Sequence, residues 1–170
     1  MTESTLTPAR LWRRMTAGQR LKAAQAFWLD EEATNDQVQA VMLISQQKKF
    51  RPKSVIGLDL DRKSKHLASL VTLPEAVAAR VLIGYHLAEQ RPMMGRFLDA
   101  LGIAHVEGLI KDDDVKPDAA KIREAVSAIA ADFPAEDVSL YLNTLFCQDP
   151  ETWGALDDVE ERRAIDAAAS

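Results

Sequence analysis

Apolar residues recur mostly every three or four positions along this chain, which is the spacing of one face of an α-helix. The clearest example is the set Ile122, Val126, Ile129 and Phe133, whose members follow one another at intervals of four, three and four. Strict alternation of apolar and polar residues, the pattern of a half-buried strand, is convincing nowhere. We therefore predict an all-α protein of about seven or eight helices.

Prolines, glycines and capping residues indicate where these helices begin and end. Thr16 and Gln19 have the spacing of a capping box, which predicts a helix start. Because the residue before a proline avoids the helical region, a helix that begins near residue 36 is expected to end before Pro52. Pro74 begins the most apolar helix, and Gly102 is suited to cap the C-terminus of a later, shorter one.

The helix that ends before Pro52 is expected to turn Val38, Val41 and Met42 toward the core. Either Thr34 or Asn35 is predicted to cap its N-terminus.

Two other segments are less regular. Residues 54–60 read as a short strand or an extended connector, and Asp61 is predicted to cap the helix that follows them. Residues 104–110 are interpreted as a turn of helix. Residues 111–117 are polar and end in proline, so we expect a loop there.

The fold expected from these elements is a compact orthogonal bundle of helices or a short helix-pair array of the HEAT kind. The second alternative rests on a weak echo between residues 36–52 and 75–92, which are offset by 39 or 40 residues. We expect a flexible N-terminus over residues 1–7, a single helical domain over residues 8–165 and a frayed C-terminus over residues 166–170. The predicted core consists of Leu11, Leu21, Trp28, Val41, Val77, Val81, Leu82, Ile122, Val126, Ile129, Leu142 and Leu145.

The composition excludes several broad classes of protein. With 47% apolar and 28% charged residues, the chain is not expected to be disordered. Its strongest apolar run, residues 76–83, contains Arg80 and is far shorter than the roughly 20 residues that span a bilayer. The single cysteine, Cys147, cannot form an intramolecular disulfide, which favours a reducing compartment such as the cytoplasm. A soluble protein without a membrane partner is expected.

No set of catalytic or metal-binding residues stands out. The apolar run ending in Asp59 and Asp61 resembles the nucleophile segment of haloacid-dehalogenase-type phosphatases, but no alternating strands and helices follow to build the sheet that this chemistry needs. The aspartates at 112–114 lack the further ligands of an EF-hand loop, and His66, His86 and His105 lie far apart in sequence. We predict no cofactor and no metal, and an enzyme is not the favoured interpretation.

The charge distribution is more informative than any motif. The net charge is −5, but residues 1–96 carry 15 basic and 9 acidic side chains, a net of +6. Residues 97–170 carry 6 basic and 17 acidic side chains, a net of −11. Within residues 1–96, two clusters of basic side chains stand out, one over residues 10–22 and one over residues 48–65.

Several interpretations of this asymmetry remain open. In one, the two halves of opposite charge attract each other within the fold. The favoured function is a non-enzymatic protein–protein interaction or adaptor domain, whose partner is another protein or a second copy of the chain. The first alternative is association with nucleic acid through the same basic clusters. The candidate interaction surface comprises Arg10, Arg13, Arg14, Lys48, Lys49, Arg51 and Lys53.

A last alternative is a small-ligand-binding bundle or an unrecognised enzyme. Its candidate pocket lies between helices beside Tyr85 and His86, a polar pair inside the most apolar predicted helix. More often, such a pair is hydrogen-bonded within a core.

Overall fold

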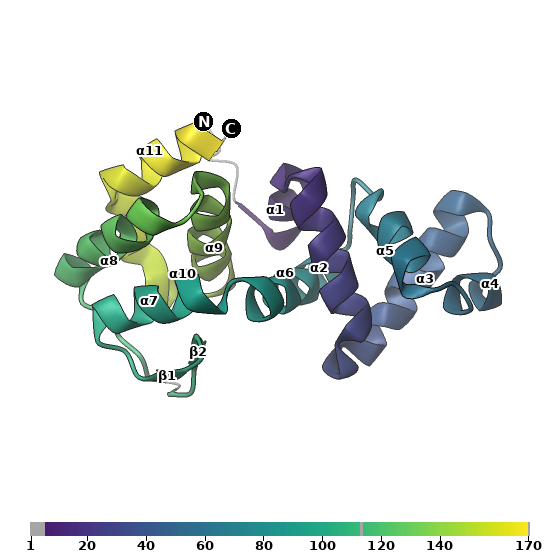
Figure 1. The fold of residues 1–170 in the computed structure, drawn as a ribbon, viewed down its shortest axis with the longest axis horizontal. Helices are drawn as coiled ribbons and strands as arrows, with labels where there is room; N and C mark the ends of the chain where they lie inside the picture. The colour runs from purple at the N-terminus through teal and green to yellow at the C-terminus, as the bar shows by residue number, and fades with distance from the viewer. Residues whose placement is uncertain (1–5, 113, 170) are drawn as a thin grey trace. The chain divides into compact units, whose positions relative to one another are not determined.

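A computed structural model describes residues 6–112 and 114–169, and it confirms the predicted all-α class. The chain is 77% helical, with eleven α-helices, two short 3-10 helices and one small hairpin in its described part (Figure 1). The number of helices exceeds the expected one mainly because short helices stand where the sequence pattern indicates connectors. The arrangement as an orthogonal bundle or a helix-pair array stays a prediction.

The chain divides into two compact units, unit 1 (Met1–Glu89) and unit 2 (Gln90–Ser170). Each has its own buried core. The expectation of a single domain over residues 8–165 stays a prediction. Most of the start predicted to be flexible, residues 1–5, lies outside the described residues.

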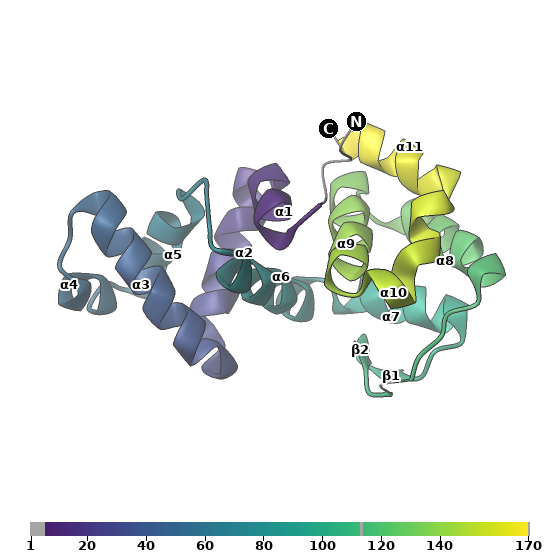
Figure 2. The ribbon, with the colours of Figure 1, turned by 180° about the vertical axis from the view of Figure 1, so that it is seen from behind.

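Unit 1 is built around α2, which packs against α5 and α6, while α1 also packs on α6 (Figures 1 and 2). The capping box predicted at the start of α2 is present, because Thr16 and Gln19 each accept a hydrogen bond from the other's backbone N–H. The elements of unit 1 are α1 (Pro8–Arg14), α2 (Ala17–Leu29), the 3-10 helix η1 (Glu31–Ala33), α3 (Thr34–Lys48), α4 (Pro52–Ile56), α5 (Leu60–Ala68) and α6 (Glu75–Glu89).

The predicted inner face of α3 is wrong in part. Val41 is buried, but Val38 and Met42 are exposed. Ala40 and Ile44, four residues apart, are fully buried instead and turn the opposite side of the helix to solvent. The predicted side-chain cap is also missing, because Ala33 holds the N-cap position.

Residues 54–60 are neither a strand nor an extended connector. They contain the end of α4, whose Pro52 occupies the first turn and whose Val55 is fully buried. Asp59, not Asp61, caps the following helix, because its carboxylate accepts a hydrogen bond from the backbone N–H of Arg62 at 2.8 Å. A single buried valine on a five-residue helix leaves too little periodic pattern to be read from sequence.

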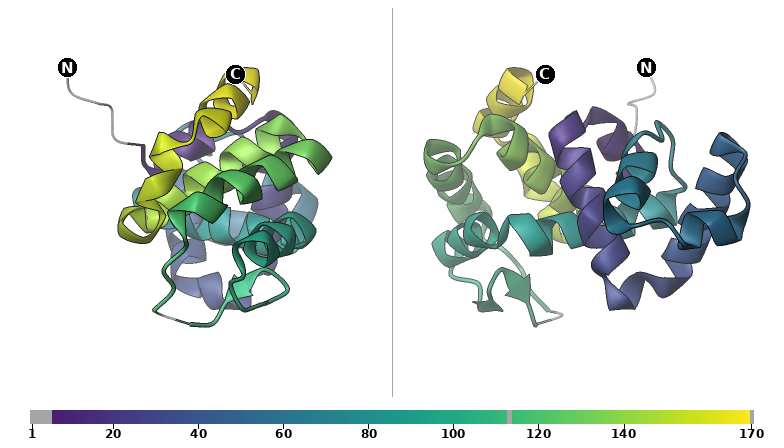
Figure 3. Two further views of the ribbon diagram at one scale, coloured as in Figure 1. Left: turned by 90° about the vertical axis from the view of Figure 1, so that its left-hand side faces the viewer. Right: turned by 45° about the vertical axis from the view of Figure 1, so that its right-hand side comes forward.

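In unit 2, α7 packs against α8, and α9 packs against α11 (Figure 3). Gly102 adopts the left-handed conformation predicted for the C-cap of α7. The elements of unit 2 are α7 (Arg91–Leu101), β1 (His105–Val106), β2 (Leu109–Ile110), α8 (Ala119–Asp132), α9 (Ala135–Gln148), α10 (Pro150–Trp153), the 3-10 helix η2 (Gly154–Asp158) and α11 (Glu160–Ala169).

The predicted turn of helix at residues 104–110 is instead a two-residue antiparallel hairpin. Its tip, Glu107 and Gly108, has φ angles of 51° and 88°, which is the conformation of a type I′ turn. His105 fixes the hairpin, since its Nδ1 accepts from the Gly108 backbone N–H and its Nε2 donates to Asp99, 2.7 Å away. Two-residue strands are too short to produce an alternating pattern.

Most of the predicted core is buried. Nine of its twelve residues are buried, while Leu21, Trp28 and Leu145 are half-buried. Among the fully buried side chains, the largest that the prediction omitted are Trp12, Phe27 and Phe97.

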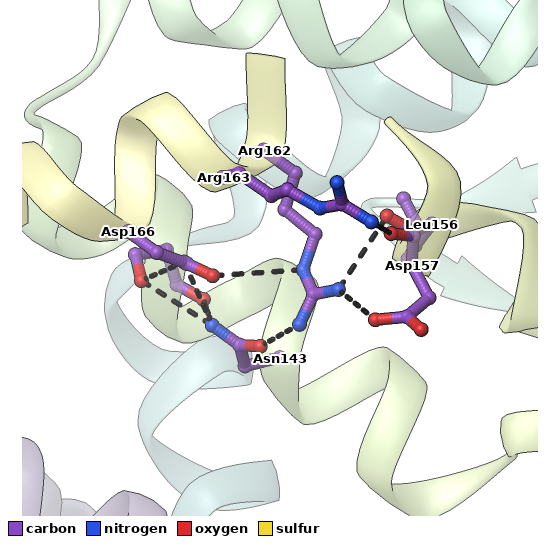
Figure 4. A network of polar contacts seen from close by, with 7 residues as sticks. Asn143, Leu156, Asp157, Arg162, Arg163 and Asp166 are labelled. Atoms are coloured by element: carbon purple, nitrogen blue, oxygen red, sulfur yellow. Dashed lines mark hydrogen bonds and ion pairs between the residues drawn. The ribbon is translucent and has the colours of Figure 1, made fainter. Parts of the chain in front are cut away.

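A buried polar network joins α9, η2 and α11 in unit 2 (Figure 4). The guanidinium of Arg162, which is 7% exposed, donates to the Asn143 side chain and to Asp157 at 3.1 Å. Asp166 lies 3.8 Å from Nε of Arg162 and accepts from the Asn143 amide at 3.0 Å and from Ser139 at 2.6 Å. Asp157 and Asp166 compensate the buried charge, and both terminal nitrogens of the guanidinium donate hydrogen bonds, although Nε has no hydrogen-bond partner among the described residues. The network therefore has a structural explanation.

Ser64, on α5, is fully buried, and its hydroxyl has no hydrogen-bond partner in the described part of the chain. We expect Ser64→Ala to raise the free energy of unfolding by about 1 kcal/mol, because it removes the desolvated hydroxyl and favours the helix. Urea denaturation measures this change, with Ser69→Ala as a control whose serine is exposed and donates to the His66 carbonyl. A destabilised Ser64→Ala protein would contradict the expectation.

Candidate protein-interaction surface

The two predicted basic clusters lie in different places within unit 1. Arg10, Arg13 and Arg14 are exposed on α1. The cluster over residues 48–65 lies on the end of α3, on α4 and on α5. Figures 1 and 2 show α2 and α5 between α1 and α4. The seven candidate residues therefore belong to two surfaces, not to one.

The cluster on α1 has a local explanation. Arg13 and Arg14 occupy the last turn of α1, where cations interact favourably with the negative end of the helix dipole. Their place on α1 thus requires no ligand.

The end of α3 holds Lys49 in an unusual conformation. Its φ angle is 58°, in the left-handed region where glycine is the common helix terminator. A side chain there costs about 1 kcal/mol relative to glycine. The next residue, Phe50, donates a hydrogen bond from its backbone N–H to the Ser45 carbonyl, and its own carbonyl accepts one from the Ser45 hydroxyl. Its ring makes a T-shaped contact with the His66 ring, with centroids 5.4 Å apart. The backbone is well held, yet the residue at its left-handed position is a lysine.

The following turn carries two further cations. Arg51 immediately precedes α4, and Lys53 lies on its first turn. Both are exposed, whereas Val55 on the same short helix is fully buried and anchors it.

Ion pairing separates the cations of this region into two groups. On α5, Arg62 pairs with Asp59 and Lys65 pairs with Asp61. Lys63 lies over the Trp28 ring, 5.3 Å from its centroid. None of the four preceding cations forms an ion pair with a described residue: Lys48, Lys49, Arg51 and Lys53.

Large apolar side chains are exposed between and beside these four cations. Ile56 is 60% exposed, Phe50 40% and Leu60 38%. Sequence reasoning identified the cations but did not place Ile56 and Leu60 on the surface, because it could not tell which side of so short a helix faces solvent. We name the seven residues together the basic–apolar patch: Lys48, Lys49, Phe50, Arg51, Lys53, Ile56 and Leu60.

Comparison with known proteins adds no information about this surface. No protein-family model, curated protein or solved structure matches the chain. Its function is therefore argued from the surface alone.

The Tyr85–His86 pair is buried in α6. The two residues are 2% and 4% exposed, their rings meet edge-on, and Nδ1 of His86 lies 2.8 Å from the Leu82 carbonyl oxygen. A surface depression of about 510 Å³ lies elsewhere, in unit 2, beside His105 and Lys111. The pocket predicted beside Tyr85 and His86 stays a prediction.

Among the described residues, no group of His, Cys, Asp and Glu is arranged to hold a metal ion. Asp112 and Asp114 lie in the expected loop, and Asp113 lies outside the described residues. In the same part of the chain, no helix has the length and apolar character needed to cross a membrane.

The boundary between the units also divides the charge. Unit 1 carries 13 basic and 9 acidic side chains, a net of +4, and unit 2 carries 8 and 17, a net of −9. Within unit 2, some carboxylates already pair with arginines, as Asp132 does with Arg96. The pKa of Glu161 lies below its ordinary value because its carboxylate accepts a hydrogen bond from its own backbone and a second one from Arg123.

Proposed function

We propose that this protein is a non-enzymatic interaction module that binds an acidic protein segment through the basic–apolar patch. The observation that carries the proposal is the mixture of four cations, none of which forms an ion pair with a described residue, with three exposed apolar side chains on one short stretch of chain. The matching ligand is an amphipathic helix with carboxylates beside leucine-like residues.

The apolar residues favour a protein partner over nucleic acid. Phosphate contacts require only the cations, and stacking on bases requires aromatic rings presented face-on. Ile56 and Leu60 are aliphatic, and the one aromatic ring among the three, Phe50, already makes a T-shaped contact with the His66 ring. The apolar surface of a partner helix uses these side chains, because burial of each removes apolar area from water.

The left-handed backbone conformation of Lys49 also supports a functional role for this patch. A cation retained at a position that favours glycine is a local departure from the best sequence for folding, and such departures concentrate at functional positions.

The test uses synthetic probes, because the chemistry of the partner is specified and its identity is not. The first probe is a fluorescent helical peptide with leucines at positions i, i+3, i+4 and i+7 and glutamates on the flanks. A polyglutamate peptide and single- and double-stranded oligonucleotides serve for comparison. We expect the amphipathic peptide to bind best, as measured by fluorescence anisotropy at several salt concentrations.

Charge reversal then locates the site. The double substitution Arg51→Glu with Lys53→Glu is expected to lower the affinity for the amphipathic peptide at least about tenfold. It is also expected to make that affinity depend less on salt concentration. Ile56→Ser is expected to weaken binding without altering the salt dependence. The matched control, Arg13→Glu with Arg14→Glu on α1, reverses the same number of charges in unit 1 and is expected to have a much smaller effect.

Two results would overturn the proposal. Equal loss of binding in the patch variant and in the α1 control would show that only net charge matters. Tighter, patch-dependent binding of an oligonucleotide would instead assign the surface to nucleic acid.

A further inference from the structure

The outward side of α3 is a continuous stripe of exposed residues. Apart from the adjacent Val38 and Gln39, successive members lie three or four positions apart, on the side opposite the buried Ala40 and Ile44. Val38 is 60% exposed and Met42, one turn further on, is 46% exposed. We name this set the α3 stripe: Asn35, Val38, Gln39, Met42 and Gln46.

The α3 stripe carries no charge, although 28% of the chain is charged. The acidic residue inside α3, Asp36, lies beside the stripe and forms an ion pair with Arg80 of α6 at 3.8 Å. A stripe without charge does not repel a copy of itself, which is the first requirement for contact across a twofold axis.

The two ends of the stripe have opposite charge. Glu31 and Glu32, in η1, immediately precede α3, and Lys48 and Lys49 end it. All four residues are exposed. None of them forms an ion pair with another described residue.

We propose that the α3 stripe binds the α3 stripe of a second copy of this chain, with the two helices antiparallel. An antiparallel arrangement centred near Ala40 places Val38 of one copy against Met42 of the other. The same arrangement brings the acidic end of each helix to the basic end of its partner, and it opposes the two helix dipoles favourably. A parallel pair would instead place like charges together at both ends.

The size of the contact indicates a weak dimer. A 15-residue helix is about 22 Å long, so one pair of helices buries less than the roughly 800 Å² per partner of a standard interface. We therefore expect association to depend on protein concentration.

Self-association does not rest on the proposed function, but it shares Lys48 and Lys49 with the basic–apolar patch. Ion pairs from Glu31 and Glu32 of a second copy would occupy these lysines, so dimer formation and binding of an acidic segment would compete. Substitutions of Arg51 and Met42 distinguish the two activities, because Arg51 belongs only to the basic–apolar patch and Met42 only to the α3 stripe.

Sedimentation equilibrium over a range of concentrations tests the proposal on the full chain. The wild type is expected to approach twice its 18.8 kDa mass as concentration rises. Met42→Lys is expected to lower the association constant at least about tenfold, because it buries a cation in the contact on both sides of the axis. Gln47→Lys, which adds the same charge to α3 outside the stripe, is the control and is expected to dimerise.

Charge reversal at the ends tests the direction of the helices. Glu31→Lys with Glu32→Lys is expected to weaken the dimer, and so is Lys48→Glu with Lys49→Glu. The protein with all four substitutions is expected to dimerise again, a rescue that loss of folding would not produce.

Cysteine cross-linking in a Cys147→Ser background tests the register of the two α3 helices in the dimer. Val38→Cys in one chain is expected to form a disulfide with Met42→Cys in another, more readily than either cysteine does with itself. A chain that stays monomeric at every concentration, an unaffected Met42→Lys protein or preferential self-pairing of each cysteine would overturn the proposal.

Discussion

Replacing Trp12 with alanine is expected to lower the free energy of unfolding by about 4 kcal/mol, because it removes a large, fully buried indole from the core of unit 1. Its side chain is fully buried on α1. Its Nε1 donates a buried hydrogen bond of 2.7 Å to the Leu70 carbonyl, which follows α5. The indole therefore ties the first helix to a segment 58 residues away. Urea denaturation, with hydrogen exchange followed in α1 and α6, measures the loss.

Trp12→Phe separates packing from hydrogen bonding. It retains most of the apolar volume but leaves the Leu70 carbonyl buried without its donor, so a loss of about 2 kcal/mol is expected. Arg13→Ala, an exposed substitution at the next position, is the control and is expected to change stability by less than about 0.5 kcal/mol. If Trp12→Ala lowers the free energy of unfolding as little as Arg13→Ala does, α1 contributes little to the stability of unit 1.

Arg162→Ala is expected to destabilise unit 2 by about 3 kcal/mol. The substitution leaves the side-chain amide oxygen of Asn143 buried without its donor and removes the cation beside Asp166 (Figure 4). It also removes the contact of the guanidinium with the Phe146 ring, whose centroid lies 5.4 Å away. Urea denaturation, with hydrogen exchange followed in α9 and α11, reports this loss where the network lies.

The adjacent Arg163 provides a matched control. It is exposed and donates one hydrogen bond, of 3.2 Å, to the Asp157 carbonyl. Arg163→Ala is therefore expected to change stability by less than about 0.5 kcal/mol. If the two alanine variants are equally stable, Arg162 is not the centre of the network.

The candidate surface was only partly accessible to sequence reasoning. Lysines and arginines close together in sequence identified the region around residues 48–53, because charged side chains are almost always exposed. Which cations pair with neighbours depends on helix register, as the Arg62–Asp59 and Lys65–Asp61 pairs show. That register is fixed only once Asp59 is known to cap α5.

The α3 stripe shows the opposite case, in which sequence reasoning placed residues in the wrong environment. Two sets of residues on α3 have the spacing of an apolar helix face. One is Val38, Val41 and Met42, and the other is Ala40, Val41 and Ile44. Packing in unit 1 selected the second set, since small Ala40 permits close approach of the neighbouring helices while Ile44 fills the core. The excess of apolar residues on α3 is what makes a second partner for its outer side reasonable.

Local rules in the sequence determined the helical class, the capping box at Thr16 and Gln19, the left-handed cap at Gly102 and the polarity of charge. Each of these depends on residues within a few positions of one another or on composition, so no distant contact is needed to read it. Only the tertiary structure decided where the chain divides into two units, between Glu89 and Gln90. It also decided the burial of Arg162 and the exposure of Val38 and Met42. These depend on which helix faces meet, and that choice is made by the summed packing of residues far apart in the chain.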